Sequence, residues 1–147
     1  MVFLCAAILL GDGDSVDSAV KGLYDVISGP IGKVRDPERM RSMFVPEAQM
    51  MVAGARFSRF SVEEFIKGSF PYMEKAGFFE KEVSRKTEQF GKIAQVFSTY
   101  ESRLHADDPK PFERGINSIQ LVNDGKRWMI ASVTWQAEDA KNPLPRG

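Results

Sequence analysis

The sequence has almost none of the residues that support cysteine or histidine chemistry. Cys5 is the only cysteine, so neither an internal disulfide nor a cysteine-based metal site can form. The only histidine, His105, stands near Asp107 and Asp108, and we expect it to be an exposed loop residue rather than a metal ligand. We therefore predict no metal site and no bound cofactor.

The chain also lacks an excess of charge of either sign. Twenty Lys and Arg residues balance twenty Asp and Glu residues, and no long basic block occurs. A general nucleic-acid-binding domain carries a basic patch that follows the phosphates, so nucleic acid is not an expected partner. With 147 residues, the chain has the length of one domain that can bury a sizeable core.

No apolar run is long enough to span a bilayer, which takes roughly 20 residues in a helix. Residues 2–10 form an apolar run that is similar to the core of a signal peptide. However, no Lys or Arg precedes this run, and the GDGDS that follows it is a poor cleavage site. Two interpretations of residues 1–14 stay open, an apolar N-terminal extension or a degenerate export signal. The chain could accordingly be cytoplasmic or exported.

Three segments carry helix signals. Ser15 suits the N-cap of a first helix, whose apolar residues recur at helical spacing until Gly29. Asp36, followed by proline, opens a short second helix. Ser61 begins a capping box for a third helix, which Pro71 should kink or divide.

Two long hairpins follow the helices. Gly91-Lys92 fits a two-residue turn with glycine first, and this register sets Arg85 opposite Ser98. Asp124-Gly125 lies between runs rich in Ile, Val and Trp, which is a strong hairpin signal. A two-residue loop there sets Asn117 opposite Ser132. Helices that precede a run of strands predict the α+β class.

The last hairpin resembles the closing hairpin of SnoaL-like members of the NTF2-like superfamily. The shared residues are Gly115, Leu121, Asp124-Gly125, Arg127-Trp128 and Ile130, and the resemblance covers residues 15–138. It implies an NTF2-like cone, in which N-terminal helices pack on a strongly bent antiparallel sheet around an internal cavity. Residues 139–147 carry no folding pattern, and we expect them to form an extended tail.

The activities of this superfamily do not transfer residue by residue. Its members include steroid isomerases, cyclases, dehydratases, epoxide hydrolases and non-catalytic modules, so the fold alone selects none of them. The isomerase-like pattern needs an Asp base, and the predicted strands contain no Asp. The dehydratase-like pattern needs a His-Asp pair, but His105 falls at a strand end. The epoxide-hydrolase-like relay needs an Asp pair around an arginine, and none flanks Arg85.

The expected pocket lies on the concave face of the sheet. Polar side chains among apolar ones, contributed by the helices and the two hairpins, are typical of a small-molecule site. The candidate lining residues are Tyr24, Phe44, Tyr72, Arg85, Ser98, Tyr100, Asn117, Trp128 and Ser132. The leading hypothesis is binding of a small apolar molecule whose acidic or carbonyl end approaches Arg85 and Tyr100.

These residues also have a structural interpretation. A buried arginine must be paired, and Arg85 could form a salt bridge with a helix acid such as Asp25 or Glu74. The buried hydroxyl and amide groups could likewise satisfy one another within the core.

Two further hypotheses stay open. An isomerase, cyclase or dehydratase would use Tyr100 as hydrogen-bond donor and a Glu or a water as base, and it predicts a carboxyl group with a raised pKa in the cavity. Alternatively, the chain is a non-catalytic dimeric interaction module. The second face of the last hairpin is apolar as well, and we expect a homodimer to cover it through Ile116, Met129, Val133 and Trp135.

Overall fold

The computed structural model describes residues 11–146, in which helices on one side pack against a six-stranded sheet. The elements are α1 (Val16–Ile27), α2 (Pro37–Ser42), β1 (Phe44–Ala53), β2 (Phe57–Ser61), α3 (Val62–Ala76), β3 (Phe79–Phe90), β4 (Ile93–Arg103), β5 (Glu113–Asn123) and β6 (Trp128–Ala137). The α+β class predicted from the sequence is confirmed. Residues 1–10, which make up most of the predicted N-terminal extension or export signal, lie outside the described residues.

The helices begin at the predicted caps. The Ser15 hydroxyl accepts the N–H of Ser18, and the Ser18 hydroxyl accepts the N–H of Ser15, which closes a capping box at the start of α1. At the start of α3 the Ser61 hydroxyl accepts the N–H of Glu64, which is one of the two hydrogen bonds of the predicted capping box. α3 continues as one helix through Pro71 and ends at Gly77, where φ is +75°.

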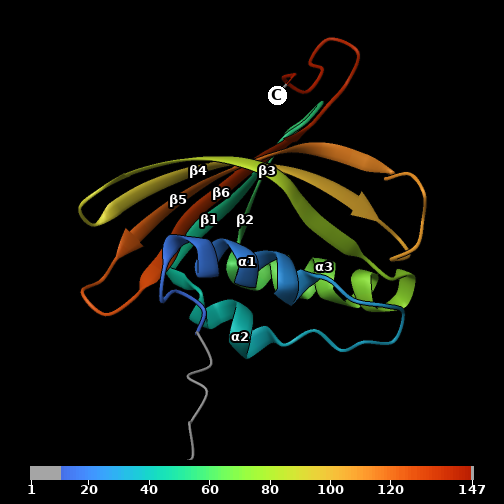
Figure 1. Ribbon diagram of the computed structural model, residues 1–147. Helices are drawn as coiled ribbons and strands as arrows, with labels where there is room; N and C mark the ends of the chain where they lie inside the picture. Colours follow the sequence, from blue (N-terminus) through green and yellow to red (C-terminus); the bar gives the residue numbers. More distant parts are fainter. Residues whose placement is uncertain (1–10, 147) are drawn as a thin grey trace, which may run out of the picture.

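The sheet is open and strongly bent, with the strand order β2-β1-β6-β5-β4-β3. All neighbouring strands are antiparallel except β1 and β6, which pair in parallel, so the predicted all-antiparallel sheet holds for four of its five pairs. Figure 1 shows the long strands β3 to β6 arched over the helices, which lie on the concave side. The C-terminal segment lies on the opposite, convex side of the sheet.

The β3–β4 hairpin follows the predicted register only near its turn. Arg85 pairs with Ser98 as expected, but a bulge between Glu82 and Ser84 shifts the rest of the strand. Glu82 therefore pairs with Tyr100, the place predicted for Val83, and Val83 is 46% exposed. A bulge moves every residue beyond it to the other face of the sheet, and hydrophobic alternation alone does not reveal it.

The register predicted for the β5–β6 hairpin is wrong. The loop is wider than two residues, because the Asp124 side chain accepts the N–H groups of Lys126 and Arg127 and the Asp124 N–H bonds the carbonyl of Arg127. A second irregularity follows Gln120. Asn117 consequently pairs with Trp135, and Ser132 pairs with Gln120 on the convex face.

The core fills the space between the helices and the concave face. It joins the buried stripe of α1 to inward residues of every strand from β4 to β6, among them Val96, Ile119 and Ile130. No helix among residues 11–146 is long and apolar enough to cross a membrane.

Candidate functional site

Five polar side chains meet on the concave face, beneath α1. Tyr24 comes from α1, Glu80 and Glu82 from β3, Ser98 from β4 and Asn117 from β5; we call them the Glu80 cluster. The hydroxyl oxygens of Tyr24 and Ser98 lie 2.6 Å apart, and the Asn117 amide donates to Tyr24 Oη at 3.0 Å. Ser98 in turn donates to Glu82. The predicted structural interpretation therefore holds for these hydroxyl and amide groups, since they satisfy one another.

Glu80 is the centre of this cluster. Its carboxylate accepts the Asn117 amide at 3.1 Å and the Ser102 hydroxyl at 3.0 Å. Its backbone is fixed as well, because the Glu80 N–H donates to Ser28 Oγ while Ser28 Oγ bonds the Glu80 carbonyl, which ties β3 to the end of α1. Burial raises the pKa of Glu80 to about 7, a rise that these two side-chain hydrogen bonds oppose and the nearby Glu113 carboxylate reinforces.

Arg85 forms an ion pair with helix and strand acids. Its guanidinium contacts Glu82 at 2.7 Å and Asp17 at 2.6 Å. The helix acid is therefore Asp17 rather than the predicted Asp25 or Glu74; Asp25 pairs with Lys21. Two carboxylates flank the guanidinium, so little of its charge is left to attract an acidic ligand.

Tyr100 is almost fully buried, with 1% of its surface exposed. Its hydroxyl donates to Glu113 at 2.8 Å, and burial together with that carboxylate raises the pKa of the phenol. Gly115 makes room for this ring, since a Cβ there would lie 2.6 Å from Tyr100 Oη. Tyr100 is thus held with its proton committed to a protein carboxylate.

An open cleft of about 570 Å³ lies beside the cluster, between α1 and the start of β3. Its lining is mostly charged, in contrast to the apolar pocket expected from the sequence, and consists of Asp17, Lys21, Tyr24, Asp25, Glu80, Lys81, Glu82 and Arg85. No group of three or more His, Cys, Asp or Glu side chains within residues 11–146 is arranged to hold a metal ion.

The nine candidate residues named from the sequence do not all meet at this cleft. Tyr24 and Arg85 line it, whereas Ser98, Asn117 and Tyr100 lie deeper. Phe44 and Trp128 belong to the hydrophobic core, and Tyr72 is 64% exposed on α3. Ser132 is on the convex face because the predicted register of its hairpin is wrong.

Sequence reasoning missed Glu80 and Glu82. The predicted register assigned both to the solvated face of the sheet, and the bulge at Val83 turns them inward. Hydrophobic alternation gave no signal for this bulge, because the unbulged register places Val83 inside and both acids outside, which is the usual pattern of a strand.

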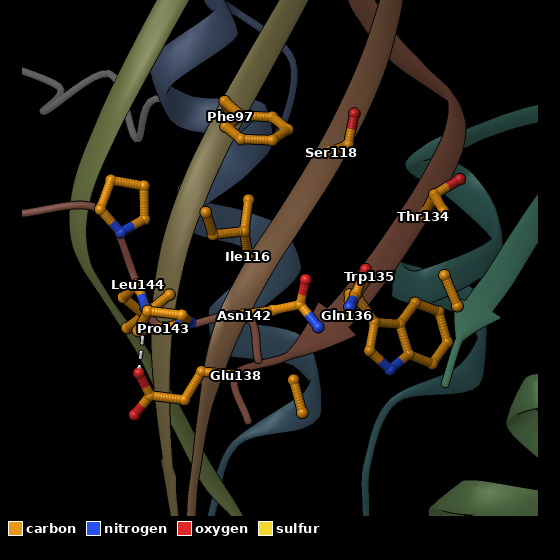
Figure 2. A pocket seen from close by; sticks show the side chains of 13 residues that line it. Phe97, Ile116, Ser118, Thr134, Trp135, Gln136, Glu138, Asn142, Pro143 and Leu144 are labelled. Atoms are coloured by element: carbon orange, nitrogen blue, oxygen red, sulfur yellow. Dashed lines mark hydrogen bonds between the residues drawn. The ribbon is translucent and has the colours of Figure 1, made fainter. Parts of the chain in front are cut away.

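The face expected to form a homodimer is also composed differently from the prediction. Val133 is buried in the core, and Trp135 packs edge-on against Phe65 of α3, so both point to the concave side. Ile116 remains on the convex face. Together with Phe97, Ser118 and Thr134 it lines a hollow of about 290 Å³. Figure 2 shows these four side chains.

The C-terminal segment closes one side of this hollow. Residues 139–146 turn back through hydrogen bonds between Asp139 and Asn142, and the N–H of Leu144 donates to Glu138 at 3.2 Å. Pro143, Leu144 and Pro145 then line the hollow on the convex face (Figure 2).

Solved structures identify the fold. An uncharacterised protein from Caulobacter vibrioides with a cystatin-like fold superposes with a TM-score of 0.67 at 12% identity, over 89% of this chain and 93% of that one. An NTF2-like protein of unknown function from Silicibacter pomeroyi gives 0.58 at 16% identity, over 83% and 92% of the two chains. A protein from Parabacteroides distasonis named "putative ketosteroid isomerase" gives 0.58 at 10% identity, over 87% and 92%.

The chain therefore has the NTF2-like, or cystatin-like, α+β fold that its last hairpin predicted. Identities this low establish the fold alone. Neither a search of protein-family models nor a search of curated proteins finds a match.

Proposed function

We propose that this chain binds a small molecule in the cleft between α1 and β3, with the polar end of the ligand against Glu80 and Tyr24. The observation that carries the proposal is the Glu80 carboxyl group, held inside the fold at the inner wall of a 570 Å³ cleft. Burying a carboxyl group costs several kcal/mol, and a merely structural network of hydroxyls and amides would avoid that cost. Ionisable groups with shifted pKa values in a cleft are typical of functional sites.

The charges around the cleft refine the ligand expected from the sequence. An acidic end was expected to approach Arg85, but Glu82 and Asp17 already neutralise that guanidinium. An added carboxylate would also meet Glu80 and Glu82 at close range. We therefore favour a ligand whose polar end is not acidic.

Binding at the cleft can be tested by mapping amide chemical shifts while a library of neutral, basic and acidic fragments is titrated. The expected hits shift resonances of α1 and the first half of β3. The Glu80→Gln variant should weaken those hits, whereas Glu88→Gln, the same change at an exposed position of β3, should leave them unchanged. Hits confined to the convex face, or equal hits in both variants, would refute the proposal.

The enzyme alternative is favoured by the position of Glu80 at the wall of the cleft, where burial raises its pKa to about 7, a value that suits a group that accepts and returns a proton at neutral pH. Glu80 would then be the base, in place of the unassigned Glu or water. Tyr100 is not free to act as the expected donor, because its hydroxyl already donates to Glu113. Deuterium uptake from D₂O into the methyl group of acetophenone tests this activity; a rate equal to that with Glu80→Gln would exclude it.

A homodimer through the convex face is the third candidate, with a revised set of residues. Phe97 is 53% exposed beside Ile116 on that face, and large exposed aromatic residues often mark interfaces. Sedimentation velocity of Phe97→Lys tests it, with Phe57→Lys, at an exposed aromatic residue on β2, as the control. Loss of the dimer in the first variant alone is expected; a monomeric wild-type protein would contradict the proposal.

A further inference from the structure

The hydroxyl and amide hydrogens of the Glu80 cluster are already donated within the protein. The single hydrogen of Ser98 goes to Glu82, so in the contact with Tyr24 the tyrosine must be the donor. The two amide hydrogens of Asn117 go to Tyr24 Oη and to Glu80. The cluster is thus a directed chain of hydrogen bonds that ends on carboxylates.

The neighbouring groups are committed in the same way. Ser102 donates to Glu80, and Tyr100 donates to Glu113. Among the cations at the cleft, Lys21 pairs with Asp25 at 2.7 Å. Lys81 also borders the cleft, but it alternates with Glu80 and Glu82 along β3 and stands opposite Glu101 in the strand register, so its side chain points to the other face of the sheet.

With Glu80 ionised, the inner wall of the cleft therefore offers lone pairs and negative charge. The cluster contains the carboxylates of Glu80 and Glu82, the Glu113 carboxylate lies nearby, and Arg85 is the cation paired with one of the three. A ligand group placed there must donate hydrogen bonds, and a positive charge would offset the surplus of acids. A carbonyl oxygen would meet acceptors only.

We propose that the cleft selects small molecules that carry a protonated amine, whose ammonium group donates to Glu80 and to the free lone pair of Tyr24. The proposal rests on the small-molecule site inferred above and names the class of its ligand. It replaces the acidic or carbonyl end expected from the sequence. The body of the molecule extends into the open part of the cleft along α1.

Four compounds of nearly the same shape separate this proposal from its alternatives. They are 1-phenylethylamine, 1-phenylethanol, acetophenone and 2-phenylpropionate. Each has a phenyl ring with a short side chain, which carries an ammonium, a hydroxyl, a carbonyl or a carboxylate group, respectively. Each is titrated to roughly 10 mM at pH 8, where Glu80 is ionised, because fragments of this size bind in the millimolar range. Shifts of α1 and β3 amides report binding.

The amine should bind at least about tenfold more tightly than acetophenone, the alcohol should fall between them, and the acid should bind most weakly. In Glu80→Gln the advantage of the amine over the ketone should disappear, while Glu88→Gln should keep it. The order measured on the wild-type protein tests the proposal even if Glu80→Gln fails to fold.

The two possible failures can be told apart. If acetophenone or 2-phenylpropionate shifts the α1 and β3 amides at a concentration as low as the amine does, the amine class is wrong and the cleft remains a binding site. If none of the four compounds shifts these amides, both the ligand class and the proposed binding function fail.

Discussion

Tyr24 of α1 and Ser98 of β4 share a hydrogen bond of 2.6 Å although 74 residues separate them in the sequence. The bond joins the first helix to the middle of the sheet. Both side chains are buried, so a group that loses its partner there has no water to replace it. We expect Tyr24→Phe to lower the free energy of unfolding by about 1–3 kcal/mol, measured by urea denaturation.

Tyr72→Phe is the matched control for this prediction. Tyr72 is 64% exposed on α3, so removing its hydroxyl should change stability by less than about 0.5 kcal/mol. Equal effects of the two substitutions would mean that the Tyr24 hydroxyl is not held in the buried network.

Glu80 should make stability depend on pH. Its folded pKa of about 7 lies above the unfolded value of 4.5, so the folded state binds the proton more tightly. The resulting stabilisation is fully present below pH 4.5, falls as the pH rises between these values and is lost above pH 7. The difference is at most about 3 kcal/mol.

Glu80→Gln, which resembles the protonated form at every pH, should therefore stabilise the protein at pH 8 and have little effect at pH 4. Denaturation curves at the two pH values measure this, with Glu88→Gln as the control that should change neither. A uniform loss of stability in Glu80→Gln at both values would show that an ionised Glu80 is favoured in the fold.

The local signals of the sequence were sufficient for the architecture. The caps at Ser15 and Ser61 and the turn at Gly91 each depend on the chemistry of two to four neighbouring residues, and the structure has all three. The order of helices and hairpins then left few ways to bury the apolar faces.

The site could not be predicted in the same way. Which side chains face the cleft depends on the number of residues between each turn and the Glu80 cluster, since one extra residue turns the following side chains to the other face of the sheet. One extra residue at Val83 turns Glu80 and Glu82 inward, and one extra residue in β6, opposite the step from Gln120 to Leu121, turns Ser132 outward. A strand tolerates such a bulge at little cost, so its position is decided by tertiary packing rather than by local sequence. Arg85 lies between the bulge of β3 and the turn, so it keeps the predicted face. Asn117 keeps its face because the extra residue of the second hairpin is in β6 and not in β5.

Arg35 is a buried cation that sequence reasoning passed over. It is 2% exposed, and its guanidinium donates to the carbonyls of Ile27, Gly29, Lys33 and Phe78. These bonds close the end of α1 and attach it to the strand that leads to Glu80. Arg35→Met should lower the free energy of unfolding by about 3 kcal/mol or more, because several buried carbonyls lose their donor.

Arg56→Met, at an exposed position between β1 and β2, removes the same charge without breaking such bonds. It should change stability by less than about 0.5 kcal/mol in the same denaturation experiment. If Arg35→Met cost no more than this control, the carbonyls around Arg35 would have to find other donors.

Glu47 is the one residue other than glycine with a positive φ among those described, at 64°. It lies in β1 between Phe44 and Gln49, where the pairing with β6 shifts register. The left-handed region costs a residue with a Cβ roughly 1–2 kcal/mol, and glycine avoids that cost while adding roughly 0.5–1 kcal/mol of backbone freedom to the unfolded chain. Glu47→Gly should therefore stabilise the protein by about 0.5–1 kcal/mol, which thermal and urea denaturation can measure.

Glu88→Gly supplies the comparison, since Glu88 is exposed in a regular part of β3 and its φ is not positive. Glycine there adds only backbone freedom to the unfolded chain and should destabilise the protein by about 0.5–1 kcal/mol. Opposite signs for the two substitutions are the expected result. A loss of stability in both would show that the Glu47 side chain compensates for its strained backbone through contacts that glycine cannot make.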